Sequence, residues 1–319
     1  MKTVIVGFGG MGRVHYANTL LIAGTSIVGI VGSGDRDRAA AESFSLPFFS
    51  SVKEAVSALE PDIVDITTPT FMHKEHVVEA IEAGCRNIIV EKPLALKSDD
   101  AAYIFSLAEE KGVRIVPAHV MRFTKEFNAL RKTVESGEFG AVLDASFSRI
   151  SAMPAWSNGW LLDKSKSGAV PFDLHIHDAD MIFALFGKPR SVTSYKRRGH
   201  ESSTDEYFHV TYSYDGFSVN AEAGWLRASV PFAASWRVIF EHAVLQCSDE
   251  RVMCYPEEGN PFQMDTHYDK IVETGINVPP TGWYYEELSA IYAYLSSEDS
   301  TQLIPYSDII EELKILERL

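Results

Sequence analysis

The stretch that decides the fold is VIVGFGGMGRVH, residues 4–15. A short β-branched run leads into glycines spaced G-x-G-x-x-G, and a helical pattern follows. In a strand–loop–helix unit, such glycines allow a tight turn, close approach of a pyrophosphate, and close packing of the helix on the strand. The N–H groups at the helix N-terminus then face the phosphate oxygens. The stretch therefore predicts a dinucleotide site rather than a structural glycine turn, and it includes Gly7, Gly9, Gly10, Met11 and Gly12.

Hydrophobic runs that are almost unbroken recur through the first third of the chain, as in strands covered on both faces. Helical patterns with readable ends separate them, such as the capping box in which Ser51 caps a helix and Glu54 reaches back. Alternating strands and helices indicate a doubly wound parallel sheet. The expected strands are 3–6, 26–31, 62–66, 87–91 and 113–117.

The pattern changes after about residue 118. A helix is expected over 126–137, and a helical tail runs from Tyr284 to Leu319. Between them, period-two alternation predicts strands in a large, mainly antiparallel open sheet. The fold class is α/β: a Rossmann domain (1–118) followed by an α+β domain (119–319), whose last helices are free to pack back on the first domain. The expected strands of the second domain are 141–150, 206–214, 217–226 and 235–248.

Composition excludes several classes of protein. The chain has 319 residues, 46% of them hydrophobic, and a net charge of −15, which repels nucleic acids and anionic membranes. The apolar start is too short for a signal peptide, and no run is long enough to span a membrane. The three cysteines form no C-x-x-C pair, as in a reducing compartment. We therefore expect a cytoplasmic protein that binds neither nucleic acid nor membrane.

The residues after the second strand bear on cofactor choice. An NAD-preferring fold usually has a carboxylate there that accepts a hydrogen bond from the ribose 2′-hydroxyl. Here the position falls on Ser33, and Arg36 and Arg38 follow it. This pattern favours NADP over NAD. In the alternative, Asp35 takes the acidic role and both arginines are solvated.

Two further motifs contain candidate catalytic groups. VEKP places Lys92 at the end of the fifth strand, where ligands of doubly wound sheets bind. There a lysine can stabilise an alkoxide-like oxygen, unless it is simply an exposed junction residue. SGAVPFDLHIHDAD, residues 167–180, is rich in histidine and aspartate. Its H-x-H pair, His175 and His177, suits either metal binding or acid–base chemistry.

Taken together, the motifs resemble the Gfo/Idh/MocA oxidoreductase family. G-x-G-x-x-G-x-x-H ends at His15, and TPTFMH (68–73), EKP (91–93) and the aspartate- and histidine-rich stretch follow in order. The resemblance covers essentially the whole chain. It implies a Rossmann domain, and a second domain whose open sheet carries the substrate site and often an oligomer interface.

Carried over by position, the resemblance implies that Lys92, Asp173 and His177 are catalytic, and it places the family's later aspartate at Asp180. The family's glycine-rich approach reads SGAVPF here, and its aspartate after strand two is Ser33. On a helix over 171–186, residues 173, 177 and 180 project within about 60° of one another at about 100° per residue. His175 then points away, so the two histidines do not converge on one metal. We expect acid–base chemistry and no metal.

Further residues are candidates for contact with the cofactor or the substrate. Cofactor contacts are also expected from Thr68, Pro69, His73, Glu91, Lys92, Ser33 and Arg38. His15 and His73 lie near the cofactor or are structural, and both readings stay open. Substrate contacts are expected from Arg122, Arg149, Trp160, Asp173 and His177, in segments that approach the substrate in relatives.

The sequence thus predicts an NAD(P)-dependent dehydrogenase or reductase acting on a sugar, inositol or related polyhydroxy compound. Hydride leaves a carbinol carbon while His177 takes the hydroxyl proton and Lys92 stabilises negative charge. One rival is a hydrolase that cleaves glycosides by transient oxidation and elimination. Another is a dinucleotide-binding sensor, disfavoured because it needs no such catalytic set. A broad open sheet face predicts a homodimer or homotetramer.

Overall fold

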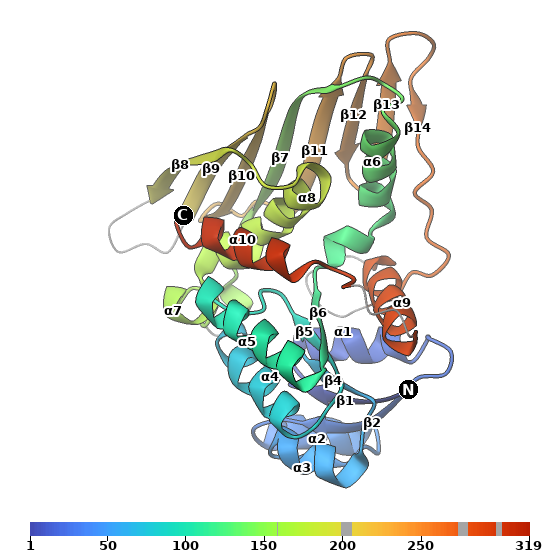
Figure 1. Ribbon diagram of the computed structural model, residues 1–319, viewed down its shortest axis with the longest axis vertical. Helices are drawn as coiled ribbons and strands as arrows, with labels where there is room; N and C mark the ends of the chain where they lie inside the picture. The colour runs from blue at the N-terminus through green and yellow to red at the C-terminus, as the bar shows by residue number, and fades with distance from the viewer. Residues whose placement is uncertain (158, 199–205, 274–279, 298–301) are drawn as a thin grey trace. The chain divides into compact units, whose positions relative to one another are not determined.

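The computed structural model describes residues 1–157, 159–198, 206–273, 280–297 and 302–319 (Figure 1). The chain divides into two compact units. The first contains Met1–Val120 and Tyr268–Ile310, and the second contains Met121–His267 and Glu311–Leu319.

The first unit contains a parallel sheet of six strands within the described residues, in the order β3-β2-β1-β4-β5-β6. All residues of β4 and β5 are buried, as their unbroken hydrophobic runs require. The doubly wound fold predicted from the sequence is confirmed. The strands are β1 (Lys2–Val6), β2 (Ser26–Val31), β3 (Phe48–Phe49), β4 (Ile63–Ile66), β5 (Asn87–Glu91) and β6 (Arg114–Ala118).

Helices connect the strands of this sheet, and α9 from the end of the chain packs on α1. Ser51 caps α3 by accepting the Glu54 N–H at 3.2 Å. The sequence predicts that the Glu54 carboxylate accepts the backbone N–H of Ser51. In the structure this carboxylate accepts from Ser50 Oγ instead, at 3.0 Å. The helices are α1 (Gly10–Thr19), α2 (Asp35–Ser43), α3 (Val52–Leu59), η1 (Thr70–Met72), α4 (His73–Glu82), α5 (Ser98–Lys111) and α9 (Trp283–Ser296).

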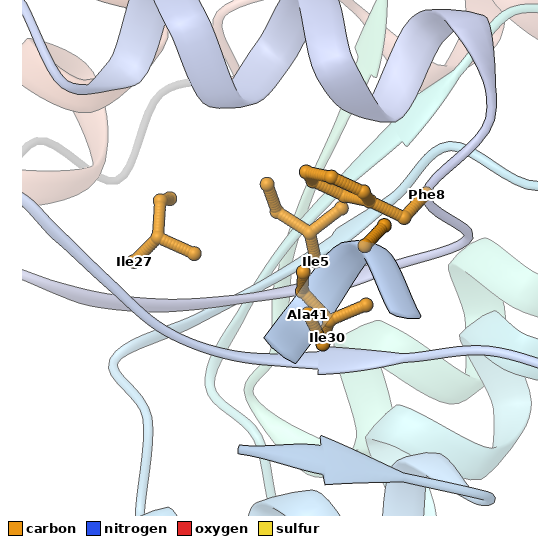
Figure 2. Packing of buried hydrophobic residues seen from close by; sticks show 6 residues of the cluster. Ile5, Phe8, Ile27, Ile30 and Ala41 are labelled. Carbon is orange, nitrogen blue, oxygen red and sulfur yellow. The ribbon is translucent and has the colours of Figure 1, made fainter. Parts of the chain in front are cut away.

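The core next to the glycine loop is apolar. Ile5, Ile27 and Ile30 of β1 and β2 pack with Phe8 and Ala41 of the adjoining loop and α2 (Figure 2). Phe8 is 1% exposed although it lies inside the glycine-rich loop. Its burial anchors that loop to the sheet, because removing an aromatic side chain from water is strongly favourable.

The second unit contains a sheet of eight strands in the described part of the chain, in the order β14-β13-β12-β11-β7-β10-β9-β8. All neighbours are antiparallel except β7 and β10, which are parallel. The mainly antiparallel prediction is confirmed. The strands are β7 (Val142–Ala152), β8 (Ser191–Arg198), β9 (Glu206–Ser213), β10 (Ser218–Leu226), β11 (Ala233–Phe240), β12 (Ala243–Ser248), β13 (Arg251–Pro256) and β14 (Phe262–Gln263).

Helices α6 and α8 pack on one face of this sheet, against β13 and β7 (Figure 1). The region 235–248 is not one strand: Glu241 and His242 turn the chain between β11 and β12, which pair with each other. The helices and turns are η2 (Val120–Phe123), α6 (Lys125–Ser136), η3 (Ala155–Ser157), α7 (Lys164–Ser167), η4 (Pro171–His175), α8 (Ile176–Phe186) and α10 (Tyr306–Leu316), the first and last of which cross the division between the units.

Candidate functional site

Each glycine of the first motif has its own role in the structure. Gly7 has φ of +87°, and a Cβ there would lie 2.7 Å from Thr68 Cγ2. At Gly12 a Cβ would lie 2.2 Å from the Gly7 carbonyl oxygen, so only glycine lets α1 pack this closely. At Gly9 a Cβ would meet nothing within 4 Å. Two glycines therefore serve the packing of the protein itself, whereas Gly9 faces open space.

That open space lies at the N-terminus of α1. Gly9 and Gly10 are exposed, and Gly9 caps the helix without a side-chain hydrogen bond. The first four N–H groups of a helix have no partner within it, and they carry a partial positive charge. Bare backbone, free donors and open space fit the pyrophosphate of a dinucleotide.

The loop after β2 carries charges of both signs. Ser33 is exposed, and its N–H donates to Asp37 Oδ2 at 3.3 Å. The guanidinium of Arg38 lies over the Phe48 ring, 4.5 Å from its centroid. Asp37 was not singled out from the sequence, although an acidic residue in the first turn of a helix commonly reaches back in this way. A ribose phosphate at Ser33 would meet both Arg38 and Asp37.

Lys92 lies between two buried residues at the end of β5. It is half-buried, whereas Glu91 and Pro93 on either side are buried. The Lys92 N–H donates to Glu91 Oε2 at 3.1 Å. Glu91, predicted to contact the cofactor, is 6% exposed and faces inward. The structure therefore assigns Glu91 to the support of Lys92.

The inward partner of Glu91 is His15, which is fully buried in α1. His15 Nε2 lies 3.0 Å from Glu91 Oε1, and its Nδ1 lies 2.9 Å from Oδ2 of the buried Asp65 in β4. Burial alone would lower the pKa of His15, but the two carboxylates outweigh it and raise that pKa well above 6.5. Burial likewise opposes ionisation of Glu91, yet His15 holds the pKa of Glu91 below its ordinary value. The three side chains thus form a buried, charged network.

His73 is the second buried histidine of this edge. Its Nδ1 lies 2.7 Å from the Pro93 carbonyl oxygen, and its Nε2 lies 2.8 Å from the Thr68 carbonyl oxygen. Burial lowers the pKa of His73, whereas the two carbonyl oxygens favour the protonated ring, which can donate to both. With both nitrogens engaged, His73 links the Thr68 and Pro93 loops. Thr68 and Pro69 themselves remain half-buried.

In the second unit, the aspartate- and histidine-rich stretch separates into two groups. Of residues 171–180, only Asp173 and His177 are not buried. A carboxylate and an imidazole four residues apart are thus both partly exposed in this unit. Such a pair can exchange a proton with a bound hydroxyl group and orient it.

The other three ionisable groups of the stretch are bound inside the unit. His175 Nε2 lies 2.8 Å from Tyr212 Oη, and burial lowers the pKa of His175 to about 4. Asp178 accepts from Nη2 of the buried Arg149 of β7 at 2.8 Å. Asp180 accepts from Arg122 Nε at 2.8 Å. Asp180 is therefore a structural partner here, although the sequence placed it on the same side as Asp173 and His177.

The helix itself differs from the regular one assumed over 171–186. Pro171–His175 forms a π-helical turn, and α8 begins at Ile176. The wider turn changes the angular offset that a constant 100° step gives between Asp173 and His177, so the argument from helical phase does not hold for this pair. Gly168 precedes it with φ of +74°, where a Cβ would lie 2.4 Å from Phe172. Partial exposure, not regular helical phase, is what separates His177 from His175.

Two predicted substrate residues have structural partners instead. Arg149 is 3% exposed, and its guanidinium donates hydrogen bonds to Asp178. This ion pair links α8 to β7. Arg122 bonds Asp180 through Nε and lies at the start of this unit. Trp160 is half-buried in the segment between β7 and α7. We assign Arg149 to the support of α8, and Trp160 remains a candidate for substrate contact.

The face of the large sheet opposite α8 carries several polar side chains. It contains a shallow hollow of about 320 Å³ whose lining includes Ser148, His209, Glu222 and Arg237. Glu222 accepts from Ser148 Oγ at 2.7 Å and also bonds Tyr207 Oη.

Within the part of the chain that the structure describes, no helix has the length and hydrophobicity that a membrane span requires.

Comparison with known proteins gives matches to both units. Residues 1–119 match the model of an oxidoreductase family with an NAD-binding Rossmann fold, and residues 127–246 match that of the GFO/IDH/MocA C-terminal domain. The chain is 19% identical to the solved UDP-N-acetylglucosamine 3-dehydrogenase of Acidithiobacillus ferrooxidans, with a TM-score of 0.82, covering 100% of this chain and 96% of that one. At this identity the likeness shows the fold alone.

Curated relatives match over shorter regions. A scyllo-inositol 2-dehydrogenase (NADP(+)) of Bacillus subtilis is 24% identical over 67% of this chain and 60% of its own length. Glucose-6-phosphate 3-dehydrogenase of the same organism is 31% identical over 58% of this chain and 53% of its own length. A 2,7-anhydro-N-acetylneuraminate hydratase of Mediterraneibacter gnavus is 30% identical over 60% of this chain and 52% of its own length. The chain thus spans between half and two thirds of these relatives.

Proposed function

Because this chain belongs to the Gfo/Idh/MocA oxidoreductase family, we propose that it is an NAD(P)-dependent dehydrogenase or reductase acting on a CH–OH group of a sugar, inositol or related polyhydroxy compound. The observation that carries the proposal is the selective partial exposure of Lys92, Asp173 and His177, whose chain neighbours are buried. Relatives named as inositol and sugar-phosphate dehydrogenases support the substrate class.

The residues that hold the cofactor are proposed from the geometry of the first unit. Gly9, Gly10 and Met11 offer their backbone N–H groups to the pyrophosphate. Ser33 and Arg38 contact the adenosine ribose of the dinucleotide. At its other end, Thr68, Pro69 and Lys92 contact the nicotinamide. The bound nicotinamide supplies hydride chemistry, which protein side chains do not provide.

The proposed catalytic roles follow from the chemistry of each side chain. His177 removes the hydroxyl proton, since imidazole is the side chain that most often serves as a general base at neutral pH. The Lys92 ammonium stabilises the negative charge that develops on the substrate oxygen. Asp173 accepts from a neighbouring substrate hydroxyl and orients it. In the direction of carbonyl reduction, His177 returns the proton.

For the cofactor we propose that NADP(H) binds at least as well as NAD(H). No carboxylate side chain occupies position 33, and Arg38 supplies a positive charge held on Phe48. Asp37 acts in the opposite direction, because its carboxylate at the Ser33 N–H repels a 2′-phosphate. The relative named as NADP(+)-dependent supports the preference.

A second candidate is a reaction with no net oxidation, in which the substrate is oxidised only transiently and then undergoes elimination or hydration. The relative named as an anhydro-sugar hydratase favours this alternative. The two are distinguished by the cofactor, because only net dehydrogenation accumulates reduced nicotinamide.

We also propose a cytoplasmic homodimer or homotetramer. All three cysteines are unpaired and buried, as in a reducing compartment. The open face of the large sheet carries Glu222 and Arg237, whose opposite charges can pair between two copies related by a two-fold axis.

The experiment that tests the activity starts from the purified chain. Any retained cofactor is identified by mass spectrometry, and a panel of polyols and aldoses is then screened with NAD and NADP for formation of reduced nicotinamide. We expect turnover with at least one polyhydroxy substrate. Conversion of a substrate without accumulation of reduced cofactor would favour the second candidate, and binding without any conversion would favour a sensor.

A further inference from the structure

Both chain neighbours of Lys92 are held by buried histidines that come from elsewhere in the first unit. His15 of α1 bonds Glu91, and His73 of α4 bonds the carbonyl of Pro93. We propose that His15 and His73 are positioning residues that fix Lys92 at the end of β5, an inference that rests on the proposed function. His73 was predicted to contact the cofactor, but both of its ring nitrogens face backbone carbonyls, and neither histidine is assigned contact with substrate or cofactor here.

The first tether is a chain of bonds through three elements. Asp65 of β4 holds one nitrogen of the His15 ring at 2.9 Å, and the other nitrogen lies 3.0 Å from Glu91 Oε1. The second oxygen of Glu91 accepts the Lys92 N–H at 3.1 Å. His15 is 0% exposed and Asp65 is 0% exposed, so water does not compete for these bonds. The orientation of the Lys92 backbone is thereby linked to the placement of α1.

The need for a histidine at position 15 follows from charge. Two carboxylates approach the ring from opposite sides, and a buried carboxylate pair is costly without a cation between them. An imidazolium donates to both through two N–H groups in fixed opposite directions, which neither a glutamine nor an alanine reproduces. Loss of His15 therefore leaves Glu91 without its inward partner and free to turn away from the Lys92 N–H.

The second tether acts on the other side of Lys92. His73 contacts the carbonyl oxygens of Thr68 and Pro93 at 2.8 and 2.7 Å, and it is 1% exposed. These carbonyls follow β4 and β5, which are neighbouring parallel strands. His73 thus joins the two loops proposed to surround the nicotinamide. Lys92 is held from both sides, and its own side chain stays half-buried.

Positioning of this kind predicts a particular loss of activity. A reacting group displaced by about 1 Å can lower the rate by roughly 100-fold without a change in binding. We therefore expect His15→Gln and His73→Gln to lower kcat by roughly 10- to 100-fold, with the Kd for the dinucleotide and KM for the substrate nearly unchanged.

The matched control is Asn18→Ala. Asn18 is also buried in α1, but its Nδ2 donates to the Val14 carbonyl at 2.8 Å, within the same helix. This substitution removes a buried polar group from α1 without touching the link to β5. It should destabilise the chain and leave kcat unchanged at temperatures where the protein is folded.

A second measurement reports on Lys92 directly and needs no turnover. Lysines of the full chain are methylated with a ¹³C label, and the Lys92 resonance is identified by its loss in Lys92→Arg. We expect its chemical shift and titration to change in His15→Gln and in His73→Gln, but not in Asn18→Ala.

The outcomes separate this inference from the proposed function. If the wild-type chain turns over no polyhydroxy substrate, the proposed function is wrong, and the Lys92 resonance still decides whether the histidines position it. The inference is overturned if the resonance is the same in both histidine variants and the wild type. It is also overturned if Asn18→Ala lowers kcat as much as His15→Gln does at equal stability.

Discussion

Gly12→Ala and Gly9→Ala form a pair of substitutions that separates packing from ligand binding in the glycine-rich loop. A Cβ at Gly12 would lie 2.2 Å from the Gly7 carbonyl oxygen, more than 1 Å inside ordinary van der Waals contact. The contact is with backbone, so it cannot be relieved by a change of rotamer. Alanine at Gly9 meets nothing within 4 Å, and its φ is negative at −76°, so the cost there is limited to a ψ of −147°, beyond the edge of the extended region.

The expected cost at Gly12 follows from this overlap. Forcing an extra methyl group into a packed site typically costs about 1–3 kcal/mol. Replacing glycine by alanine inside a helix returns up to about 1 kcal/mol. Because α1 has to move away from β1 as a whole, we take the upper end of the packing cost. After subtraction of the helix contribution, we expect Gly12→Ala to lower the free energy of unfolding by about 2 kcal/mol, and Gly9→Ala by less than about 1 kcal/mol.

For cofactor binding we expect the opposite order of effects from that for stability, with the larger loss in Gly9→Ala. The methyl group of Gly9→Ala enters the space proposed for the pyrophosphate, so we expect at least a tenfold weaker dinucleotide, about 1.4 kcal/mol. Urea unfolding measures the stability of each variant, and titration calorimetry measures cofactor binding. Unchanged cofactor binding in Gly9→Ala would show that the pyrophosphate does not bind at this helix terminus. Unchanged stability in Gly12→Ala would show that the close packing of α1 is not required.

The remaining predictions concern catalysis, cofactor choice, assembly and pH. His177→Ala should lower kcat by roughly 10²–10⁴-fold with the Kd for the cofactor nearly unchanged, whereas His175→Ala should act through stability; the reverse pattern in steady-state kinetics would contradict the assignment. Arg38→Ala should weaken NADP binding selectively, and a tenfold or greater preference of the wild type for NAD, about 1.4 kcal/mol, would refute the proposed preference. Light scattering should give a mass well above the 35.5 kDa of one chain, and a monomer at micromolar concentration would exclude the proposed assembly. The pKa of His15 is raised in the folded state, so its stabilising contribution is complete below the ordinary value of 6.5 and is lost as the pH rises through the folded pKa. The difference in unfolding free energy between wild type and His15→Gln should therefore shrink as the pH is raised above 6.5, and a difference that grows would show that the ring is not held protonated.

The parts of the fold that could be predicted are those specified by local pattern. Buried parallel strands are continuous apolar runs, and β2 and β5 have the predicted bounds. The strand β3 was missed because Phe48–Phe49 is too short to show any period. The β11–β12 hairpin was read as one strand, because the alternation of apolar residues continues almost unbroken through its turn at 241–242.

The candidate site was predictable only as far as residue type and order allow. Motif order identified Lys92, Asp173 and His177, but the partners that fix their surroundings are distant in sequence. Asp178 lies 29 residues from Arg149, and Asp65 lies 50 residues from His15. Such ion pairs have no local signal, so the sequence could not predict the partners that Arg149 and Glu91 have in the structure. The π-helical turn before α8, which packs against β10, was not predicted either.

Deuterium transfer tests the central claim most directly. The wild-type chain is incubated with NAD or NADP and polyhydroxy substrates that carry deuterium on their carbinol carbons, and the mass of the nicotinamide ring is then measured. The proposed activity predicts reduced cofactor that has gained one deuterium, with Lys92→Ala and His177→Ala suppressing the transfer. Substrate conversion with no deuterium retained by the cofactor pool, or cofactor binding with no transfer from any substrate of the panel, would contradict it.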